Sequence, residues 1–160
     1  MVNIWILSFG LPINFLNCIL LKPILAADFE FPDLNLHKLA FGSCHNLKYA
    51  NESNVNELWE SVIQQDVQAW LWTGDAIYPK ARHGRIAELE VMEQQYNTMK
   101  SFKGYAKLIQ QVPVFGTWDD HDYGGNDGGY DMPDRQKRAQ LYWNFLYNTT
   151  NIPLHHDPNA

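Results

Sequence analysis

Residues 69–78 read AWLWTGDAIY, and this stretch decides the fold. The short apolar run from Ala69 to Thr73 predicts a buried strand. Gly74 and Asp75 follow, and a glycine lets the backbone turn sharply, so that the carboxylate projects over the end of the sheet. Tyr78 lies three residues further on, within reach of the same point. The alternative is that Asp75 caps an ordinary turn on which Tyr78 packs.

Strand and helix patterns alternate on both sides of this stretch. The predicted strands are His37–Phe41, Ala69–Thr73 and Pro113–Trp118, and the predicted helices are 54–63 with Asn54 as N-cap, 86–109 with a break near Gly104, and Pro133–Leu146. This β-α-β-α-β-α order is typical of an α/β fold with a parallel sheet. We find no repeat, low-complexity tract or composition shift after residue 30 that would mark a second domain.

Polar residues follow each predicted strand directly. Cys44 comes after the first strand, Asp75 after the second, and the run 119–122 after the third. In open parallel sheets, ligands bind beyond the carboxyl ends of the strands. The sequence therefore predicts a binding site at this end of the sheet.

The run WDDHD, residues 118–122, is the densest of these groups. Three carboxylates lie within four positions, and no Lys or Arg lies inside the run to offset them. Like charges this close raise one another's pKa values or attract a cation. His121, between Asp120 and Asp122, is a candidate ligand or a candidate acid whose imidazolium a neighbouring carboxylate holds. The alternative is a solvated acidic loop.

The segment FGSCHN, which begins at Phe41, offers a thiol at the end of the first strand. Cys44 is either a small buried apolar residue or a thiolate ligand, which would select iron, zinc or copper over magnesium. His45 is expected to be an exposed polar residue, because adjacent residues on an extended chain face opposite ways.

Composition limits the classes of protein to consider. The 160 residues are 46% hydrophobic and 14% aromatic, which excludes a disordered chain. A net charge of −6 without a run of Lys or Arg lacks the footprint of a nucleic-acid binder. This balance suits a cationic ligand or metal ions better.

Residues 1–27 are apolar and end in Leu-Ala-Ala, as in a secretory signal peptide cleaved before Asp28. The alternative is an uncleaved anchor, although Lys22 and the asparagines make a spanning helix expensive. The sequons at Asn51 and Asn148 agree with a secreted glycoprotein. We therefore expect a leader at 1–27, one domain at 28–160, and no membrane contact beyond the leader.

Together, the segments FGSCH (41–45), WTGDAIY (72–78) and WDDHD (118–122) resemble the alkaline phosphatase D (PhoD-like) family of calcineurin-like metallophosphoesterases. The resemblance covers roughly residues 37–147 and keeps the order of the family's motifs. It implies a metallophosphoesterase-like β-sandwich of two sheets flanked by helices, with only the first β-α-β-α-β-α part present in this chain.

The resemblance also implies a centre of Fe(III) and Ca(II) with assigned ligands. Cys44 and Tyr78 would ligate iron, and Asp75 would bridge the two metals. Asp120, with Asp119 as a further participant, would bind the second metal. A thiolate and a phenolate suit iron, and hard carboxylates suit calcium.

Two further residues would carry the chemistry by resemblance. His121 would contact the phosphate or protonate the leaving oxygen, and Asp122 would orient it, although the family more often has Glu at that position. The implied reaction is hydrolysis of phosphomonoesters or phosphodiesters by a metal-activated water or oxide.

The chain ends at Ala160, before the family's second half and its later G-D-x-H motif. We therefore expect this form to be inactive or nearly so, with an exposed sheet edge at its third strand and exposed apolar surface. One alternative is a non-catalytic secreted module that binds calcium or a partner protein. A third hypothesis is a hydrolase that uses only residues 119–122.

Overall fold

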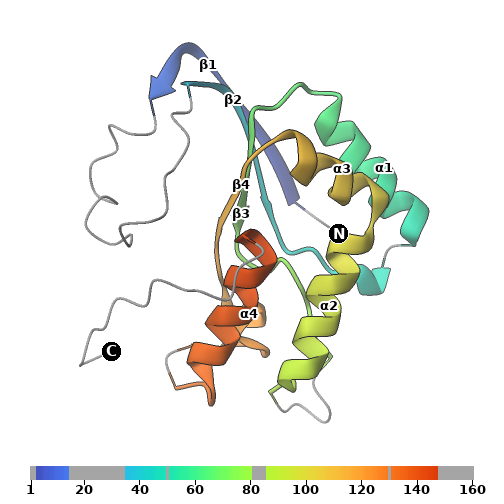
Figure 1. The fold of residues 1–160 in the computed structure, drawn as a ribbon, viewed down its shortest axis with the longest axis vertical. Helices are drawn as coiled ribbons and strands as arrows, with labels where there is room; N and C mark the ends of the chain where they lie inside the picture. Colours follow the sequence, from blue (N-terminus) through green and yellow to red (C-terminus); the bar gives the residue numbers. More distant parts are fainter. Residues whose placement is uncertain (1–2, 15–34, 50, 81–85, 130, 148–160) are drawn as a thin grey trace.

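The computed structural model describes residues 3–14, 35–49, 51–80, 86–129 and 131–147, which form an α/β fold with a mixed sheet. The sheet order is β1-β2-β3-β4 (Figure 1). The strands are β1 (Asn3–Asn14), β2 (Asn35–Ser43), β3 (Ala69–Thr73) and β4 (Val114–Thr117). β1 runs antiparallel to β2, whereas β2, β3 and β4 run parallel to one another.

The predicted β-α-β-α-β-α order and the parallel arrangement of its three strands are confirmed. β3 has the predicted bounds, β2 is longer than predicted, and β4 begins one residue later and ends one residue earlier than predicted. β4 lies at the end of the sheet formed by the described residues, so the third predicted strand is an edge strand. The antiparallel β1 is an addition that the alternating pattern did not predict.

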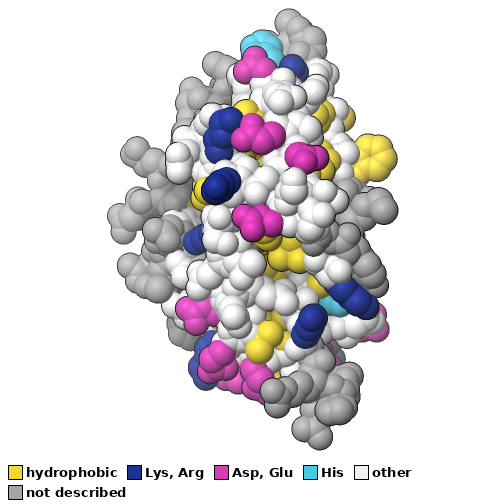
Figure 2. Space-filling view, turned by 90° about the vertical axis from the view of Figure 1, so that its right-hand side faces the viewer, with side chains coloured by type: hydrophobic (Ala, Val, Ile, Leu, Met, Phe, Trp, Pro, Cys, Tyr) yellow, Lys and Arg dark blue, Asp and Glu magenta, His cyan; other side chains and the backbone are white. Residues whose placement is uncertain are grey.

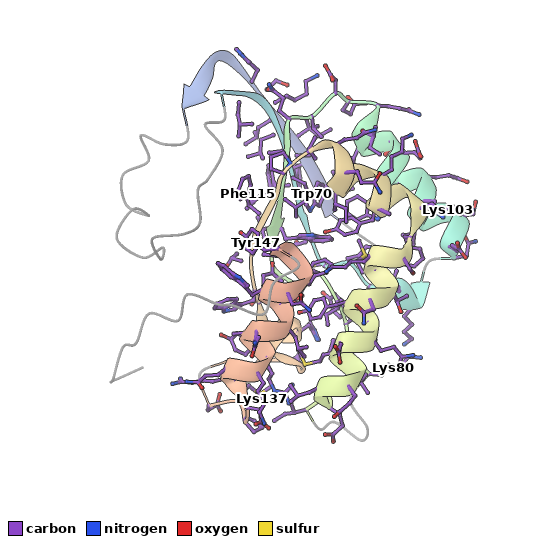
Figure 3. The ribbon with its side chains drawn as sticks, in the orientation of Figure 1. Trp70, Lys80, Lys103, Phe115, Lys137 and Tyr147 are labelled. Atoms are coloured by element: carbon purple, nitrogen blue, oxygen red, sulfur yellow. The ribbon has the colours of Figure 1, made fainter. Side chains whose placement is uncertain are left out.

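The four described α-helices cover one face of the sheet (Figure 1). They are α1 (Glu52–Ile63), α2 (Leu89–Ser101), α3 (Lys103–Gln111) and α4 (Arg135–Tyr147). Their buried side chains join Trp70 and Trp72 of β3 in one hydrophobic cluster. The buried residues of the opposite face form a second cluster that contains strand residues only. Figure 3 shows Trp70 on the helix side and Phe115 on the other side.

Trp59 of α1 is the centre of the aromatic packing. Its ring centroid lies 4.9 Å from those of Trp70 and Tyr105, and 5.6 Å from that of Trp72. The Trp70 contact is edge-to-face, an arrangement that aromatic quadrupoles favour. Small residues flank the β3 tryptophans in the neighbouring strands, since Gly42 pairs with Trp72 and Gly116 pairs with it from the other side. The sheet therefore makes room for large side chains on one strand.

The predicted start of the first helix was wrong. Helix α1 begins one turn earlier than predicted, because the side chain of Asn51, not that of Asn54, caps it by accepting from the Asn54 backbone N–H at 2.8 Å. The predicted break near Gly104 is confirmed, and it lies at Phe102, whose extended backbone separates α2 from α3.

Gly104 instead allows α1 and α3 to approach closely. A Cβ at this position would lie 2.7 Å from the Asn56 carbonyl oxygen and 2.8 Å from the Trp59 Cβ. The Gly104 N–H also donates to the Asn56 side-chain oxygen at 2.9 Å, which holds the start of α3 against α1. The close approach brings Tyr105 onto Trp59.

We predict that Gly104→Ala destabilises the fold by about 1–3 kcal/mol, because the added methyl group overpacks the contact between α1 and α3. An alanine elsewhere in a helix would stabilise it relative to glycine. Urea unfolding of the full chain measures the difference. The exposed neighbour Lys103→Ala is the control and should change stability by less than about 0.5 kcal/mol. A Gly104→Ala variant as stable as the wild type would contradict the packing argument.

β1 lies within the predicted leader. Its backbone pairs with β2 from Asn3 opposite Ser43 to Ser8 opposite Lys38, and again at Ile13 and Asn14.

The predicted cleavage site after Ala27 and the sequon at Asn148 lie outside the described residues. Among the helices that the structure describes, none has the length and apolar character to cross a membrane. The leader and its cleavage stay predictions.

Candidate metal centre

The loops that follow β2, β3 and β4 meet at the carboxyl end of the sheet, as predicted. The His45 N–H donates to the Asp75 carbonyl oxygen at 2.9 Å, which joins the first two loops. The Asp75 N–H donates to the Asp122 carboxylate at 2.6 Å, which joins the second and third. Candidate side chains from three separate motifs therefore share one region.

Two candidate ligands stand in a strained backbone conformation. Cys44 has φ 60° and Asp75 has φ 53°, in the left-handed region that side chains other than glycine rarely adopt. Gly74, which directly precedes Asp75, has φ 100°, and a Cβ at this position would meet the Asp119 Cβ at 2.5 Å. Such residues cluster at functional sites in proteins, where surrounding structure enforces them. Of the five described non-glycine residues with positive φ, these two are ones that the sequence singled out as ligands.

The two carboxylate oxygens of Asp75 face different partners. Oδ2 accepts from the Tyr78 hydroxyl at 2.7 Å and lies 3.9 Å from the Cys44 sulfur. Oδ1 accepts from the His121 backbone N–H at 3.3 Å. Only 6% of Asp75 is exposed. The carboxylate thus lies between a thiol and phenol pair on one side and the residues after β4 on the other.

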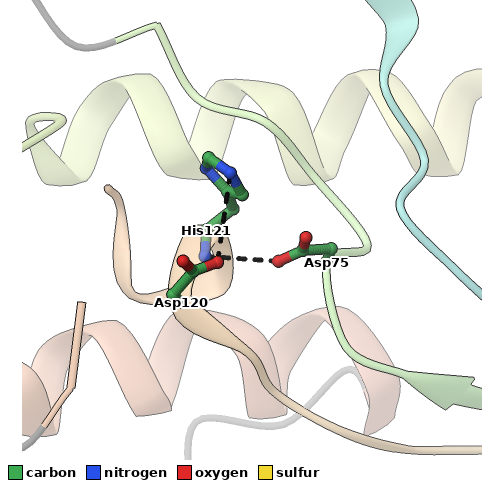
Figure 4. A group of neighbouring side chains, drawn as sticks. All are labelled: Asp75, Asp120 and His121. Carbon is green, nitrogen blue, oxygen red and sulfur yellow. Dashed lines mark hydrogen bonds and ion pairs between the residues drawn. The ribbon is translucent and has the colours of Figure 1, made fainter. Parts of the chain in front are cut away.

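Asp75, Asp120 and His121 form a compact group (Figure 4). Each offers a ligand atom, and these atoms all lie within 4.8 Å of one another. The His121 Nε2 lies 3.9 Å from Asp120 Oδ1, and the imidazole packs on the Tyr78 ring with centroids 4.1 Å apart. His121, predicted as an acid, therefore lies close enough to two predicted metal ligands for the three side chains to bind one metal ion.

Asp119 and Asp120 have different surroundings. Asp119 is exposed and caps the 3-10 helix η5 (Asp120–Tyr123), where its side chain accepts from the Asp120 N–H at 2.9 Å. Asp120 turns its Oδ2 to the Asp127 N–H at 2.6 Å. Asp119 is a capping residue outside the group in Figure 4, so the structure adds nothing to its predicted role as a ligand.

Asp122 ties the loops together instead of contacting His121. Its Oδ2 accepts from the N–H groups of Asp75 at 2.6 Å and Asp119 at 3.1 Å. Its Oδ1 accepts from the Ala76 N–H at 3.1 Å and the Tyr96 hydroxyl at 3.2 Å. Both oxygens are used in this way, and no contact with the His121 side chain occurs among the described residues. The structure thus gives Asp122 a position different from the predicted orienting contact.

Burial governs the protonation of the carboxylates. It raises the pKa of Asp122 to about 7, against the opposing effect of the N–H groups that donate to it. Burial also raises the pKa of Asp75, although the hydrogen bond from Tyr78 lowers it. The pKa of Tyr78 is raised by burial first and then by its bond to Asp75. Groups whose negative forms are disfavoured in this way gain most from a nearby cation.

The expectation that His45 is exposed was wrong. The ring is buried, with centroids 5.8 Å from Trp59 and 6.0 Å from Trp72. Burial lowers its pKa to about 4, with a backbone hydrogen bond to Ala76 opposing the shift, so the imidazole is neutral at pH 7. Its Nδ1 has no hydrogen-bond partner in the structure. His45 packs beneath the site and carries no charge to it.

Tyr96 is a supporting residue of the site that the sequence analysis did not select, although its position in the sequence could have indicated it. It lies on the apolar face of α2 with Met92 and Met99, where a hydroxyl needs a buried acceptor. Asp122 is that acceptor.

The predicted glycosylation residue Asn51 is exposed and caps α1 with its side-chain oxygen.

Comparisons of the chain with protein-family models, with curated proteins and with solved structures found no match. The chemical interpretation of the site therefore depends on its own geometry and on the three motifs that meet there.

The raised pKa of Asp122 predicts a pH dependence of stability. Between about pH 4 and about pH 7, the Asp122 carboxyl group keeps its proton in the folded state and loses it in the unfolded state. The free energy of unfolding therefore falls as the pH rises through this window. The Asp122→Asn variant has no ionisable group at this position, so this source of pH dependence is absent from it. It is less stable than the wild type, because an amide nitrogen cannot accept two of the four hydrogen bonds that Asp122 accepts. We expect the stability gap between wild type and this variant to narrow from pH 4.5 to pH 7.5. Urea unfolding at several pH values measures the gap, and a gap that widens with pH would contradict the assignment.

Proposed function

We propose that this chain is the N-terminal part of a PhoD-like metallophosphoesterase that hydrolyses phosphomonoesters or phosphodiesters. The observation that carries the proposal is the position of Asp75, whose two oxygens face two different sets of candidate ligands. A carboxylate so placed suits a pair of metal ions. The resemblance of the three motifs to this family predicts the same pairing.

The donors on one side of Asp75 suit Fe(III). Cys44 offers a thiol and Tyr78 a phenol, and both adjoin Oδ2. Thiolates are soft ligands that select transition metals over magnesium or calcium. The raised pKa of Tyr78 means that the phenol keeps its proton in the metal-free protein, and a bound cation would favour the phenolate.

The donors on the other side suit Ca(II) together with a proton carrier. Asp120 supplies carboxylate oxygens, which calcium prefers. The His121 imidazole is a poor calcium ligand, and this leaves it to contact the phosphate or to protonate the leaving oxygen. Asp120 Oδ1 lies 3.9 Å from the imidazole Nε2.

Metal ions bound at these residues would supply neutralisation of the phosphate charge and activation of water. The chain's own residues contribute orientation and proton transfer. Packing on Tyr78 fixes the plane of the His121 ring, and the bond from the His121 N–H to Asp75 fixes its backbone. We infer that His121, oriented in this way, contacts the phosphate or protonates the leaving oxygen.

The surface and the leader indicate the partners. Basic and acidic side chains are interspersed on the face shown in Figure 2, without the single-sign surface that a nucleic acid would need. The substrate is proposed to be a phosphate ester in the secretory pathway or outside the cell. The chain is proposed to enter that pathway through residues 1–27 and to carry glycans at Asn51 and Asn148.

We expect the full chain to bind Tb(III), a luminescent substitute for calcium, and Asp75→Asn to weaken this binding at least about tenfold. Asparagine tolerates the left-handed backbone at this position, so the variant removes the charge and keeps the fold. Luminescence titration, sensitised by the nearby aromatic rings, gives the affinity. Asp66→Asn is the matched control, because Asp66 is exposed, has φ 55° and lies in the turn after α1. Equal affinities of both variants would argue against a metal centre at Asp75.

Iron separates the proposed enzyme from the alternative of a non-catalytic calcium-binding or partner-binding module. We expect Fe(III) to give the chain a visible charge-transfer band that Tyr78→Phe and Cys44→Ser each alter. Tyr123→Phe is the control, since Tyr123 also lies after β4 but packs its ring on Trp118. A chain that binds Tb(III) and develops no colour with Fe(III) would favour the module. A phosphatase activity indifferent to Cys44→Ser would favour the hypothesis that residues 119–122 act alone.

A further inference from the structure

Arg138 is a buried cation outside every motif discussed above. It lies on α4 with only 4% of its surface exposed, on the same helical face as Tyr142 and Phe145. We propose that Arg138 is a positioning residue that holds η5 in place, so that Asp120 and His121 face Asp75. The relevance to catalysis rests on the proposed function, whereas the positioning itself does not.

The guanidinium joins three segments through their backbone carbonyls. Its Nη1 donates to the carbonyl oxygens of Tyr123 and Ala87, each at 2.9 Å. Its Nε donates to the carbonyl oxygen of Pro133 at 2.8 Å. Tyr123 is the last residue of η5, and Ala87 precedes α2. The side chain thus connects the end of η5 to α2 and to the start of α4.

A second bond closes the same junction. The Ala87 N–H donates to the Gly124 carbonyl oxygen at 2.7 Å, directly after the residue that Arg138 holds. Gly124 has φ 99°, and a Cβ at this position would collide with Arg138 Nη1. The left-handed glycine therefore both ends η5 and leaves the space that the guanidinium fills.

The chemistry of the contacts favours positioning over simple packing. Burial lowers the pKa of Arg138 from its ordinary value, which shows that the site disfavours the charge. Within the part of the chain that the structure describes, the hydrogen bonds of this side chain go to carbonyls and to the Met92 sulfur, not to a carboxylate. An apolar side chain of similar volume would fill the space without this desolvation. What it could not supply is a planar set of donors in fixed directions.

The consequence for the site follows from the length of η5. The helix has four residues, and the Asp122 side chain ties its N-cap to the loop after β3, because it accepts from the N–H groups of both Asp119 and Asp75. Arg138 holds the last residue of the helix, Tyr123. Asp120 and His121 lie between the two ends that are held in this way. Loss of the second attachment would leave both side chains free to move away from Asp75.

The test compares Arg138→Met, Arg138→Lys and Gly124→Ala in the full chain, with Lys137→Met as the control. Lys137 is the exposed neighbour of Arg138 on α4, and its ammonium group pairs with the Asp134 carboxylate. Hydrogen exchange of the Asp122 and Gly124 amides reports the order of η5 without metal. Tb(III) titration reports the metal group, and exchange in β3 shows that the sheet remains folded.

We expect Arg138→Met and Gly124→Ala to speed exchange of the η5 amides and to weaken Tb(III) binding about 10–100-fold, as loss of residues that orient ligands does. Arg138→Lys should restore part of both, and Lys137→Met should change neither. Should Arg138→Met fail to fold, the other two variants still decide. Unchanged η5 exchange in folded variants overturns the proposal. A wild-type chain that does not bind Tb(III) overturns the metal function instead, and the exchange data alone then decide the role of Arg138.

Discussion

A buried carboxylate at Asp122 accepts hydrogen bonds from backbone groups on two different strand-end loops and from a tyrosine of α2. This arrangement converts the general tendency of parallel strands to end together into a defined geometry. Without it, the loops after β3 and β4 would share an edge of the sheet but no fixed distance. The candidate ligands at Asp75, Asp120 and His121 depend on that distance, because Asp122 binds the N–H group of Asp75 itself and that of Asp119, which Asp120 and His121 follow directly.

The helices on one face of the sheet form the packed base on which these strand-end loops lie. Trp59, Trp70 and Trp72 fill the space between sheet and helices, and His45 packs on two of them directly under the site. Close-packed interiors resist small displacements. A strained backbone at Cys44 and Asp75 is stable only on such a base, since each left-handed residue costs roughly 1–2 kcal/mol.

The sequence predicted what depends on local pattern and on parallel topology. The run at 69–73 specified its strand, and the strand-end position of Asp75 and Asp120 specified their meeting. His45 was misplaced because alternation assumes an extended chain, whereas Cys44 turns into the left-handed region and reverses the expected direction. The partners of Asp122 and Arg138 escaped prediction for another reason. Their bonds to Asp75, Ala76 and Ala87 join residues 46 to 51 positions apart, and no local pattern encodes them.

β1 gives one stretch of chain two competing uses. Residues 3–14 complete the sheet beside β2, and the same residues carry the apolar character expected of an export signal. A segment that is paired with β2 in the sheet is not free to act as a leader, so the two uses exclude each other. Among residues 4–8, the part of β1 whose side chains the structure describes, Ile4 packs on the main core and Trp5 is 62% exposed. Removal of β1 would leave the parallel strands that carry the site together with their helices.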